Sequence, residues 1–351
     1  MKTTIAILAA TAALNSPGHA REAGSRDARG QLNFQGRYIV SVQDADMVGS
    51  AYVNGQLGPR EGADTLAVIP LEGDPRDWQA AEVFASNSVA GPPNAVSISP
   101  DGRFAIVIET FTPRPDNNDP HVFSDLQVGA KAQVFDLQDP TRPTAVQTID
   151  VPARPDAVSF NTRGDIVAIT YNPTNGAGGE TPLTLHRFQD GKLEAGVAPS
   201  VLGWPMGDRM IDAAWHPEEN ILAMIDSSGG ATLTFARVTD DLAVEPFGNV
   251  VDIERAPYRV LFTPDGSHVV VNATYWGPDI AGTWVEAPVG SVLTVRMNAE
   301  VRNDGSVRHA LIDRVETGVS PEGLAVSPDG RWVATVNLER SYLPYDDPRI
   351  T

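Results

Sequence analysis

The chain has no cysteine among its 351 residues. Disulfide bonds are therefore excluded, and any closed architecture must be held together by packing and strand pairing. A small extracellular domain of the eukaryotic type would normally carry disulfides, so this composition favours a bacterial periplasmic or secreted protein if the chain is exported.

Basic residues are scarce relative to acidic ones. Lysine and arginine number 26 against 45 aspartates and glutamates, which gives a formal net charge of −19 at pH 7. Such a surface repels phosphate backbones and anionic lipid, so nucleic acid and membrane surfaces are poor partners. Cations, neutral sugars or basic patches on other proteins remain compatible with it.

Long apolar runs are missing beyond the first 20 residues. Lys2 precedes the apolar run Ile5–Leu14, and small residues lead up to Ala20. This order predicts a secretory signal peptide over residues 1–20, cleaved after Ala20, followed by a flexible segment over 21–33. The apolar run is too short for a permanent membrane anchor, and a buried N-terminal helix is the alternative. We expect a protein with no membrane span in the periplasm or outside the cell.

A repeat occupies the remainder of the chain. The phrase Ser-Pro-Asp-Gly-Arg occurs at 99–103 and at 327–331, with degraded copies between them. Five ungapped rows begin at Pro93, Pro155, Met210, Pro257 and Pro321, and a partial copy covers Gly36–Val42. The turn residues Pro100, Thr162, Pro217, Pro264 and Pro328 are spaced by 62, 55, 47 and 64 residues, a period typical of propeller blades with variable insertions.

Each unit reads as four strands. The first precedes the Pro-Asp-Gly turn and the second follows it, because proline presets φ and glycine accepts a positive φ in a tight hairpin. First strands include Ala95–Ser99 and Leu324–Ser327, and second strands include Phe104–Ile108 and Trp332–Val336. Third strands are expected at Thr65–Leu71, Ala132–Leu137, Leu183–Phe188, Ala231–Val238 and Ser291–Met297. Fourth strands are expected at Gln79–Phe84, Ala145–Val151, Phe247–Ile253, His309–Val315 and, in the third row, near Ala195–Leu202.

The sequence therefore predicts an all-β protein, a β-propeller of four-stranded blades over residues 34–351. The count of 31 glycines and 28 prolines suits its many turns, and a hydrophobic content of 42% is enough to bury the sheet faces between blades.

The rows resemble the YVTN-type repeats of seven-bladed propellers, a group that includes the lactonase-like propellers and bacterial surface-layer repeats. The resemblance covers about Phe34 to the end and implies seven blades in a full ring. About five and a half blades are present here, which indicates a C-terminally truncated chain or a ring with fewer blades. The motif indicates the fold and leaves the ligand open.

Loops between second and third strands are long in most units and gather on one face of a propeller, which is a common sign of a binding face. The long loops are Gln43–Ala63, Glu109–Ala130, Asn172–Thr181 and Asn272–Gly290. Their aromatic residues include Phe111, Tyr171, Tyr275 and Trp276. These side chains could form a rim for a polar ligand or a protein partner, or they could pin the loops onto the ring.

The starts of the innermost strands supply a second set of candidate ligand-binding residues at the mouth of the channel. A mixed ring of acids and arginines there could hold a small anionic or zwitterionic molecule, or the side chains could pair with one another and with water. The aligned rows place these residues there: Asn94, Asp156, Ile211, Tyr258 and Glu322, with Arg209, Asp212 and Arg259 beside them.

An enzyme is the alternative to a binding or scaffold protein. Lactonase-like propellers tend to carry Pro-Arg-His at the start of an inner strand, and no histidine stands at the matching triplets here. The histidines of the repeats are scattered, so we expect each to be a solitary surface residue rather than part of a zinc or general-base site. A lactonase-type hydrolase acting on a sugar lactone would have to use Glu322, Asp156 and Arg259.

No cofactor is expected, apart from a possible calcium ion. Asp116 and Asp119 flank two asparagines and could offer oxygen ligands, but the spacing does not match a calcium-binding loop and a solvated turn is the alternative. No glycine-rich phosphate loop precedes a helix and no Gly-x-Ser-x-Gly elbow occurs, which excludes nucleotide chemistry of that type and α/β-hydrolase chemistry.

Overall fold

The computed structural model describes residues 36–88, 94–115, 117, 120–172, 181–199, 210–227, 230–276, 288–339, 341, 343 and 346–348. The first two sheets contain β1 (Tyr38–Gln43), β2 (Thr65–Pro70) and β3 (Ala81–Phe84), and then β4 (Val96–Ile98), β5 (Phe104–Phe111), β6 (Val128–Asp136) and β7 (Thr144–Asp150). The third contains β8 (Pro155–Phe160), β9 (Ile166–Tyr171), β10 (Leu183–Gln189) and β11 (Lys192–Leu193). The fourth contains β12 (Met210–Trp215), β13 (Ile221–Asp226), β14 (Thr232–Val238), β15 (Val244–Pro246) and β16 (Val251–Asp252). The last two contain β17 (Pro257–Phe262), β18 (His268–Ala273), β19 (Val289–Val301), β20 (Val307–Val319), β21 (Pro321–Val326) and β22 (Val333–Asn337). Among the described residues, helical structure is limited to α1 (Ala51–Asn54) and the 3-10 turns η1 (Pro75–Asp77) and η2 (Phe123–Asp125).

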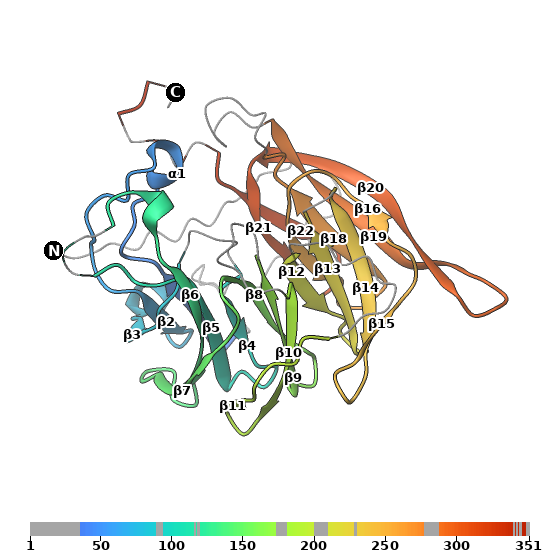
Figure 1. The fold of residues 1–351 in the computed structure, drawn as a ribbon, viewed down its shortest axis with the longest axis horizontal. Helices are drawn as coiled ribbons and strands as arrows, with labels where there is room; N and C mark the ends of the chain where they lie inside the picture. The colour runs from blue at the N-terminus through green and yellow to red at the C-terminus, as the bar shows by residue number, and fades with distance from the viewer. Residues whose placement is uncertain are drawn as a thin grey trace.

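These strands form separate antiparallel sheets that follow one another along the chain and fan out around a common axis (Figure 1). Among the described residues, the first sheet is β1-β2-β3 and the last is β21-β22. Between them lie β4-β5-β6-β7, β11-β10-β9-β8, β12-β13-β14-β15 with β16 beside β14, and β17-β18-β19-β20. The predicted all-β propeller of four-stranded blades is confirmed. In the first sheet, β1 corresponds to the second strand of the other units.

The repeated phrase builds the same turn each time. The Ser99 hydroxyl donates to the Asp101 carboxylate at 2.6 Å and accepts from the Phe104 N–H at 2.9 Å. The Gly102 N–H donates to the Ser99 carbonyl at 2.8 Å, and Gly102 adopts a φ of 70° that only glycine accepts at little cost. The corresponding bonds join Ser327 to Asp329 and Trp332. The turn therefore pairs the first two strands of a unit in one register.

Rows without serine at this position replace it with another side chain that bonds to the turn. Asn161 accepts the N–H groups of Asp165 and Ile166 through its amide oxygen. His216 accepts the N–H groups of Glu218 and Glu219 through Nδ1 at 3.1 and 3.0 Å. The turn chemistry thus survives where the sequence repeat fades.

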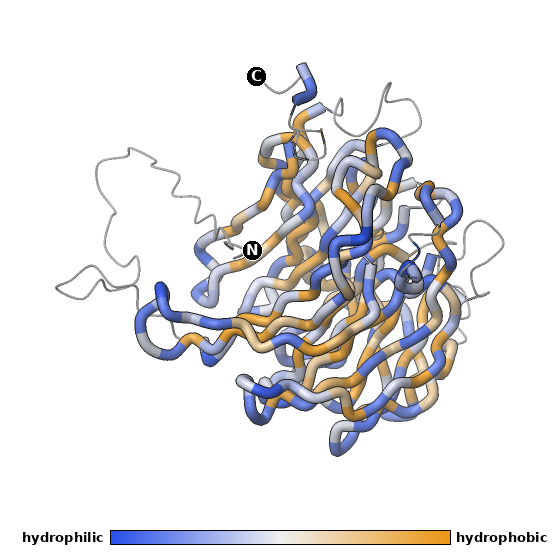
Figure 2. Tube along the Cα trace, turned by 90° about the vertical axis from the view of Figure 1, so that its left-hand side faces the viewer, coloured by the Kyte–Doolittle hydropathy of each residue, from blue (hydrophilic) through white to orange (hydrophobic). Residues whose placement is uncertain are grey.

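The core lies between consecutive sheets. Ile108 and Val134 of one sheet pack against Val158 and Ile169 of the next, and similar clusters separate the following pairs of sheets. Figure 2 shows apolar residues concentrated along the strands and polar residues at many of the turns. Each fully buried valine, leucine or isoleucine contributes about 1.5–3 kcal/mol, so this packing can hold the sheets without disulfides.

Strand positions agree with the sequence prediction except for the fourth strands of two units. In the fourth sheet, the expected strand Phe247–Ile253 is replaced by β15 and β16, which flank residues 247–250. The other exception is the third sheet. The fourth strand there is β11 at Lys192–Leu193, followed by a single bridge between Leu185 and Val197, and not a strand starting at Ala195. The signal peptide and the segment 21–33 lie outside the described residues. Within the part of the chain that the structure describes, no helix is long and apolar enough to cross a membrane.

Candidate functional site

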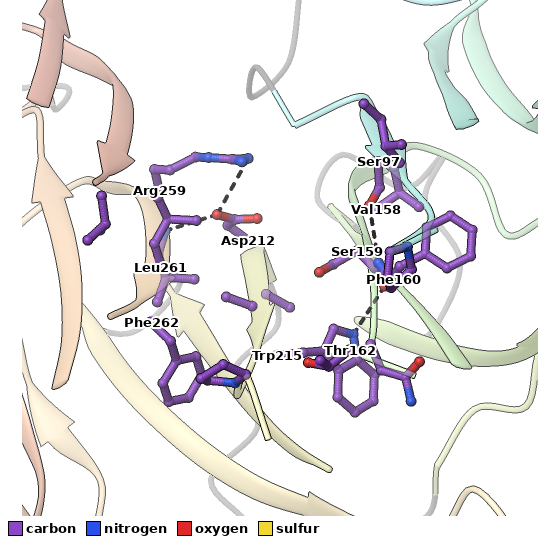
Figure 3. Close-up of a pocket in the computed structure, with 18 of the residues that line it drawn as sticks. Ser97, Val158, Ser159, Phe160, Thr162, Asp212, Trp215, Arg259, Leu261 and Phe262 are labelled. Atoms are coloured by element: carbon purple, nitrogen blue, oxygen red, sulfur yellow. Dashed lines mark hydrogen bonds and ion pairs between the residues drawn. The ribbon is translucent and has the colours of Figure 1, made fainter. Parts of the chain in front are cut away.

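A cavity of about 470 Å³ lies on the axis of the propeller, between the innermost strands of five sheets (Figure 3). These strands are β4, β8, β12, β17 and β21, each of which contacts the next. Its walls are divided about equally between apolar groups, such as Val158 and Leu261, and polar groups, such as Ser97 and Ser159. The cavity is formed by the fold itself, because every wall is an inner strand or a hairpin turn.

One end of the cavity is charged. Arg259 and Asp212 stand on neighbouring inner strands, with Arg259 Nη1 3.9 Å from Asp212 Oδ2. Figure 3 shows the guanidinium pointing toward the carboxylate. The Asp212 side chain is 4% exposed and that of Arg259 is 28% exposed, so the carboxylate is buried beneath a partly accessible cation. Arg259 lies close to the start of β17, and this end therefore faces the loop-rich side of the propeller.

Asp212 has a perturbed acidity. Burial raises the pKa of its carboxyl to about 6, against the opposing effects of the Arg259 charge and of N–H donation from Val260 and Ala213. The Val260 N–H donates to Asp212 Oδ2 at 2.9 Å. A carboxyl group with a raised pKa beside a cation and in a cavity is typical of functional sites.

Asn272 fixes the backbone around Arg259. This fully buried residue of β18 accepts the Arg259 N–H at 2.7 Å through Oδ1. Its amide nitrogen donates to the carbonyls of Pro321 at 2.6 Å and Glu322 at 3.1 Å on the neighbouring sheet. One buried amide thus ties the starts of two inner strands together and positions the charged end of the cavity.

The opposite end of the cavity is aromatic. Trp215, Phe262 and Thr162 are drawn together at the end of Figure 3 away from the Arg259–Asp212 pair. The Trp215 indole N–H donates to the Ser159 carbonyl at 3.1 Å, and the Thr162 hydroxyl donates to the His216 carbonyl at 2.9 Å. These bonds satisfy the polar atoms, so the aromatic faces are left for apolar contact.

The ligand-binding residues predicted at the starts of the inner strands differ in their contacts and do not form one site. Asn94 and Asp156 are 1% exposed and belong to neighbouring units, since Asn94 bridges to Ala157. Neither side-chain polar atom of Asn94 has a hydrogen-bond partner among the described residues. Tyr258 is 9% exposed and packs edge-on against Trp276 at 5.4 Å. Arg209 lies outside the described residues.

The set proposed for hydrolysis is spread around the channel. Asp156 begins β8 and Glu322 begins β21, with β12 and β17 between them in the order of inner strands. Arg259 of β17 faces Asp212, a residue that the sequence analysis named only as a neighbour. The sequence signal for this pair was the mixture of acids and arginines at the starts of the inner strands in the aligned rows.

The predicted loop aromatics Tyr275 and Trp276 contact other parts of the protein. The Tyr275 hydroxyl donates to Glu254, which also accepts from Ser291 at 2.5 Å and from Arg314 Nε at 2.6 Å. The Trp276 indole N–H donates to the Ser320 hydroxyl at 2.8 Å. Both side chains therefore hold the described start of this loop, up to Trp276, onto the ring.

The long loops of the first two sheets pack on each other. Leu57 and Phe111 share an apolar cluster with Ala51 and Leu126. The buried Arg114 guanidinium donates to the carbonyls of Asp46, Gly58 and Pro120. This part of the loop-rich face is an ordered extension of the sheets, held by a buried cation on backbone oxygens.

The expectation of solitary surface histidines is wrong for three of them. His186 and His309 are 1% exposed and His216 is 9% exposed. His186 bonds to the Thr184 hydroxyl and the Glu194 carbonyl, and His309 bonds to the Phe247 carbonyl and the Asn298 N–H. His186 and His216 bond within their own blades, whereas His309 also bonds to the preceding blade through the Phe247 carbonyl, so burial is compensated by hydrogen bonds in each case.

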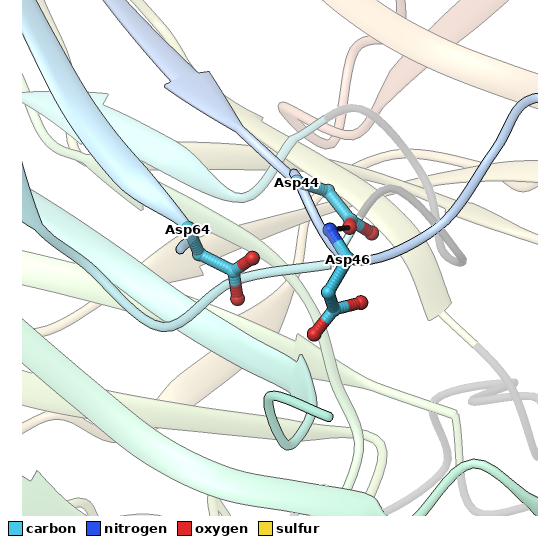
Figure 4. A group of neighbouring side chains, drawn as sticks. All are labelled: Asp44, Asp46 and Asp64. Carbon is cyan, nitrogen blue, oxygen red and sulfur yellow. Dashed lines mark hydrogen bonds between the residues drawn. The ribbon is translucent and has the colours of Figure 1, made fainter. Parts of the chain in front are cut away.

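Three carboxylates that the sequence analysis did not single out meet at the two ends of the β1–β2 loop (Figure 4). Oxygens of Asp44, Asp46 and Asp64 lie within 4.8 Å of one another. Burial, then the charges of Asp46 and Asp44, raise the pKa of Asp64 to about 7. Oxygen clusters of this kind suit hard cations such as calcium. The signal was an Asp-x-Asp beside one strand end and an aspartate before the next strand, whereas Asp116 and Asp119 lie outside the described residues.

No family model and no curated protein matches the chain. Solved structures do share its fold. Hydrazine synthase from Kuenenia stuttgartiensis is 17% identical with a TM-score of 0.50, over 82% of this chain and 71% of that one. A candidate 6-phosphogluconolactonase from Bacteroides uniformis is 13% identical with a TM-score of 0.50, over 87% and 72%. The β-propeller domain of Cps50 (Swd1) from Myceliophteria thermophila is 13% identical with a TM-score of 0.50, over 77% and 74%. At these identities the similarity shows the propeller fold alone.

Proposed function

We propose that this protein is an exported β-propeller that binds a small polar ligand in its axial cavity, reached from the loop-rich face. The observation that carries the proposal is the preformed cavity of about 470 Å³ with the Arg259–Asp212 pair at one end. Ligand sites in proteins are typically concave, mostly apolar and equipped with a few convergent polar groups. This cavity is concave and carries a charged pair at one end, although polar groups form about half of its walls.

The walls favour binding over a purely structural channel. The Asp212 carboxylate is buried, whereas the Arg259 guanidinium beside it stays partly accessible. A buried ion pair that serves only stability would be expected to have close, hydrogen-bonded geometry. The separation of 3.9 Å lies at the outer limit of an ion pair. Because the guanidinium and the carboxylate do not use all of their hydrogen-bonding capacity on each other, they can also form hydrogen bonds with a ligand.

Filling the cavity tests this proposal. Ser159 lines the cavity from β8 and is partly exposed, so Ser159→Phe places a ring in the space without touching the charged pair. We expect a small-molecule panel to raise the melting temperature of the wild-type protein for at least one compound. We expect that compound to have no effect on the Ser159→Phe variant.

The matched control is Ser306→Phe, which adds the same ring at an exposed position between β19 and β20. This variant should respond to the compound as the wild type does. If no compound affects the wild type, or if Ser159→Phe responds equally, the cavity is not the binding site.

A lactonase-type hydrolase is the second candidate, favoured by the raised pKa of Asp212 beside Arg259. A carboxyl with a pKa of about 6 can take up a proton near neutral pH, and the guanidinium can polarise an ester carbonyl. Turnover of a sugar-lactone panel by the wild type, lost in Asp212→Asn, would favour this function. Binding of lactones without turnover would favour the binding function.

Export is proposed from Lys2, the run Ile5–Leu14 and the small residues before Ala20. Mass spectrometry of the protein recovered from the periplasm or medium of a bacterial host should find a mature chain that begins at Arg21. A chain retained in the cytoplasm with Met1 in place would contradict export.

A further inference from the structure

Arg259 is the one cationic residue among the described residues that line the cavity, and its guanidinium is incompletely used. Its backbone N–H bonds to Asn272 and its Nη1 lies 3.9 Å from Asp212. No hydrogen bond from the guanidinium to another described residue accompanies that ion pair. A guanidinium presents five N–H donors in a planar fork that matches a carboxylate in a bidentate manner.

Asp212 meets the guanidinium only at an ion-pair distance of 3.9 Å and does not take up the remaining donors. Its Oδ2 already accepts the Val260 N–H at 2.9 Å, and the side chain is held below the surface of the cavity at 4% exposure. The Arg259 side chain is seven times more exposed, so its free donors face the cavity. The Asn272 amide holds the β17 backbone from behind and keeps the guanidinium at this end.

The remainder of the lining restricts the charge and shape of the ligand. Arg259 is the single lysine or arginine among the described lining residues and shares its charge with Asp212, so the site compensates at most one negative charge of a ligand, and a dianionic phosphate would keep a charge uncompensated. Away from the charged pair, the aromatic rings of Trp215 and Phe262 offer contact for an apolar group.

We propose that the ligand of this cavity is a small amphipathic monocarboxylate, whose carboxylate binds the Arg259 guanidinium and whose apolar body packs toward Trp215 and Phe262. The inference rests on the proposed function, since it names the ligand class of the same cavity. Arg259 is then the residue that determines specificity for the anion, and Asn272 is the residue that positions it.

Calorimetric titration of the full chain with paired probes tests the ligand class. The probes are phenylacetate against phenylacetamide and hexanoate against hexanamide, with inorganic phosphate as a separate anion. We expect each carboxylate to bind at least 10-fold more tightly than its amide, and phosphate to bind more weakly than either carboxylate, because charge-assisted bonds to arginine are the stronger ones.

Variants assign the effect to Arg259. Arg259→Gln should weaken carboxylate binding by about 10- to 100-fold and leave amide binding within about 3-fold. Arg296→Gln, at an exposed position of β19, is the matched control and should change neither. Asp212→Asn removes the charge that competes for the guanidinium and should bind carboxylates at least as tightly as the wild type.

Two results would overturn the inference. One is equal affinity for carboxylate and amide in the wild type. The other is an equal loss of carboxylate binding in Asp212→Asn and Arg259→Gln, which would mean that the pair acts by holding the structure. Failure of the proposed function looks different, because then no probe binds the wild type in a manner that Ser159→Phe abolishes.

Discussion

Asp64 is the residue at which charge and burial conflict most clearly. It is 1% exposed and lies within 4.8 Å of two other carboxylates, which together with burial raise its pKa to about 7. Its ordinary value is 3.8, so between about pH 4 and pH 7 the folded protein retains a proton that the unfolded chain has released. The free energy of unfolding therefore falls as pH rises through this window.

Replacing this carboxyl with an amide should remove that pH dependence. We expect Asp64→Asn to melt at a higher temperature than the wild type at pH 8, by a few degrees, and at about the same temperature at pH 4. Thermal unfolding followed by circular dichroism measures both. Glu72→Gln, an exposed acid in the next loop of the same sheet, should show no such difference. A destabilised Asp64→Asn at pH 8 would mean that the charge is stabilising, as it would be with a bound cation.

Ala256 carries a different local cost. Its φ is 55°, a left-handed conformation in which a Cβ is unfavourable by about 1–2 kcal/mol. It precedes Pro257, and its carbonyl accepts both the N–H and the hydroxyl of Thr274. Arg154 and Ser320 precede the corresponding prolines of other units with φ of 58° and 54°. The conformation is therefore a repeated feature at the start of the inner strands.

Glycine at position 256 should relieve this strain. We expect Ala256→Gly to raise the free energy of unfolding by about 0.5 kcal/mol, because the relief exceeds the added entropy of the unfolded chain. Urea unfolding gives the value. Ala145→Gly, at an exposed position of the ordinary strand β7, should instead lower it by about 0.5–1 kcal/mol. Equal losses in both variants would show that Ala256 is unstrained.

At the scale of the element, the hairpin turn is the unit that repeats. Ser99, Asn161, His216, Thr263 and Ser327 occupy one aligned position, and each side chain bonds to the turn that follows it. His216 does so with an imidazole that also packs against Phe262 at 5.2 Å between ring centres. Its burial is thus explained by the turn and not by catalysis.

Removing the His216 side chain, which caps the turn between β12 and β13, should weaken the fourth sheet. His216→Ala leaves the N–H groups of Glu218 and Glu219 without their acceptor and should cost about 1–2 kcal/mol in unfolding free energy. His216→Asn should retain most of the stability, because a short amide accepts the same N–H groups in an Asx turn. His121→Ala, on an exposed side chain, should be neutral within about 0.5 kcal/mol. An Asn variant as unstable as the Ala variant would contradict the capping role.

The strands and turns that could be predicted from sequence are those determined by nearby residues, such as the turn glycines and the alternating apolar runs. Gly102 and Gly330 marked the turns, and the alternating runs beside them form paired antiparallel strands, as predicted for a hairpin. The prediction failed at β11, where the fourth strand follows a tight turn at Asp190 and Gly191 and ends after two residues. No repeat phrase marks that segment.

The site was less accessible to prediction because its members are brought together by neighbouring units. Arg259 and Asp212 are 47 positions apart and meet only when two inner strands lie side by side. Asp64 meets Asp44 across a loop whose length gave no sign that its ends converge. Alignment of the rows did place Arg259 and Asp212 at the channel, so the repeat predicted where these residues lie but not that they form an ion pair.

At the scale of the whole molecule, the propeller is a stack of sheets around one cavity. Apolar clusters separate each pair of consecutive sheets, from β1–β3 to β17–β20, so each sheet depends on its neighbours for burial. The cavity is a product of this arrangement, since no single unit contains it. A substitution that shifts one inner strand, such as one at Asn272, therefore affects both stability and the charged end of the cavity.

The net charge of −19 acts on the whole stack. With 45 acids against 26 bases, repulsion outweighs attraction, and exposed ion pairs such as Arg142–Asp139 contribute little. Raising salt from about 0.01 M to about 1 M shortens the screening length from about 30 Å to about 3 Å. We therefore expect the melting temperature at pH 8 to rise with sodium chloride, as measured by calorimetry.

The excess of negative charge also determines how the melting temperature depends on pH. Lowering pH from 8 to 5 protonates Asp64 and Asp212, whose pKa values are raised to about 7 and about 6, and removes two unfavourable buried charges. Stability should increase over this range, and the gain from salt should be smaller at pH 5 than at pH 8. The double variant Asp64→Asn/Asp212→Asn should lose most of the pH response and keep the salt response. A fall in melting temperature with added salt at pH 8 would mean that specific ion pairs, and not net repulsion, dominate the electrostatics of this protein.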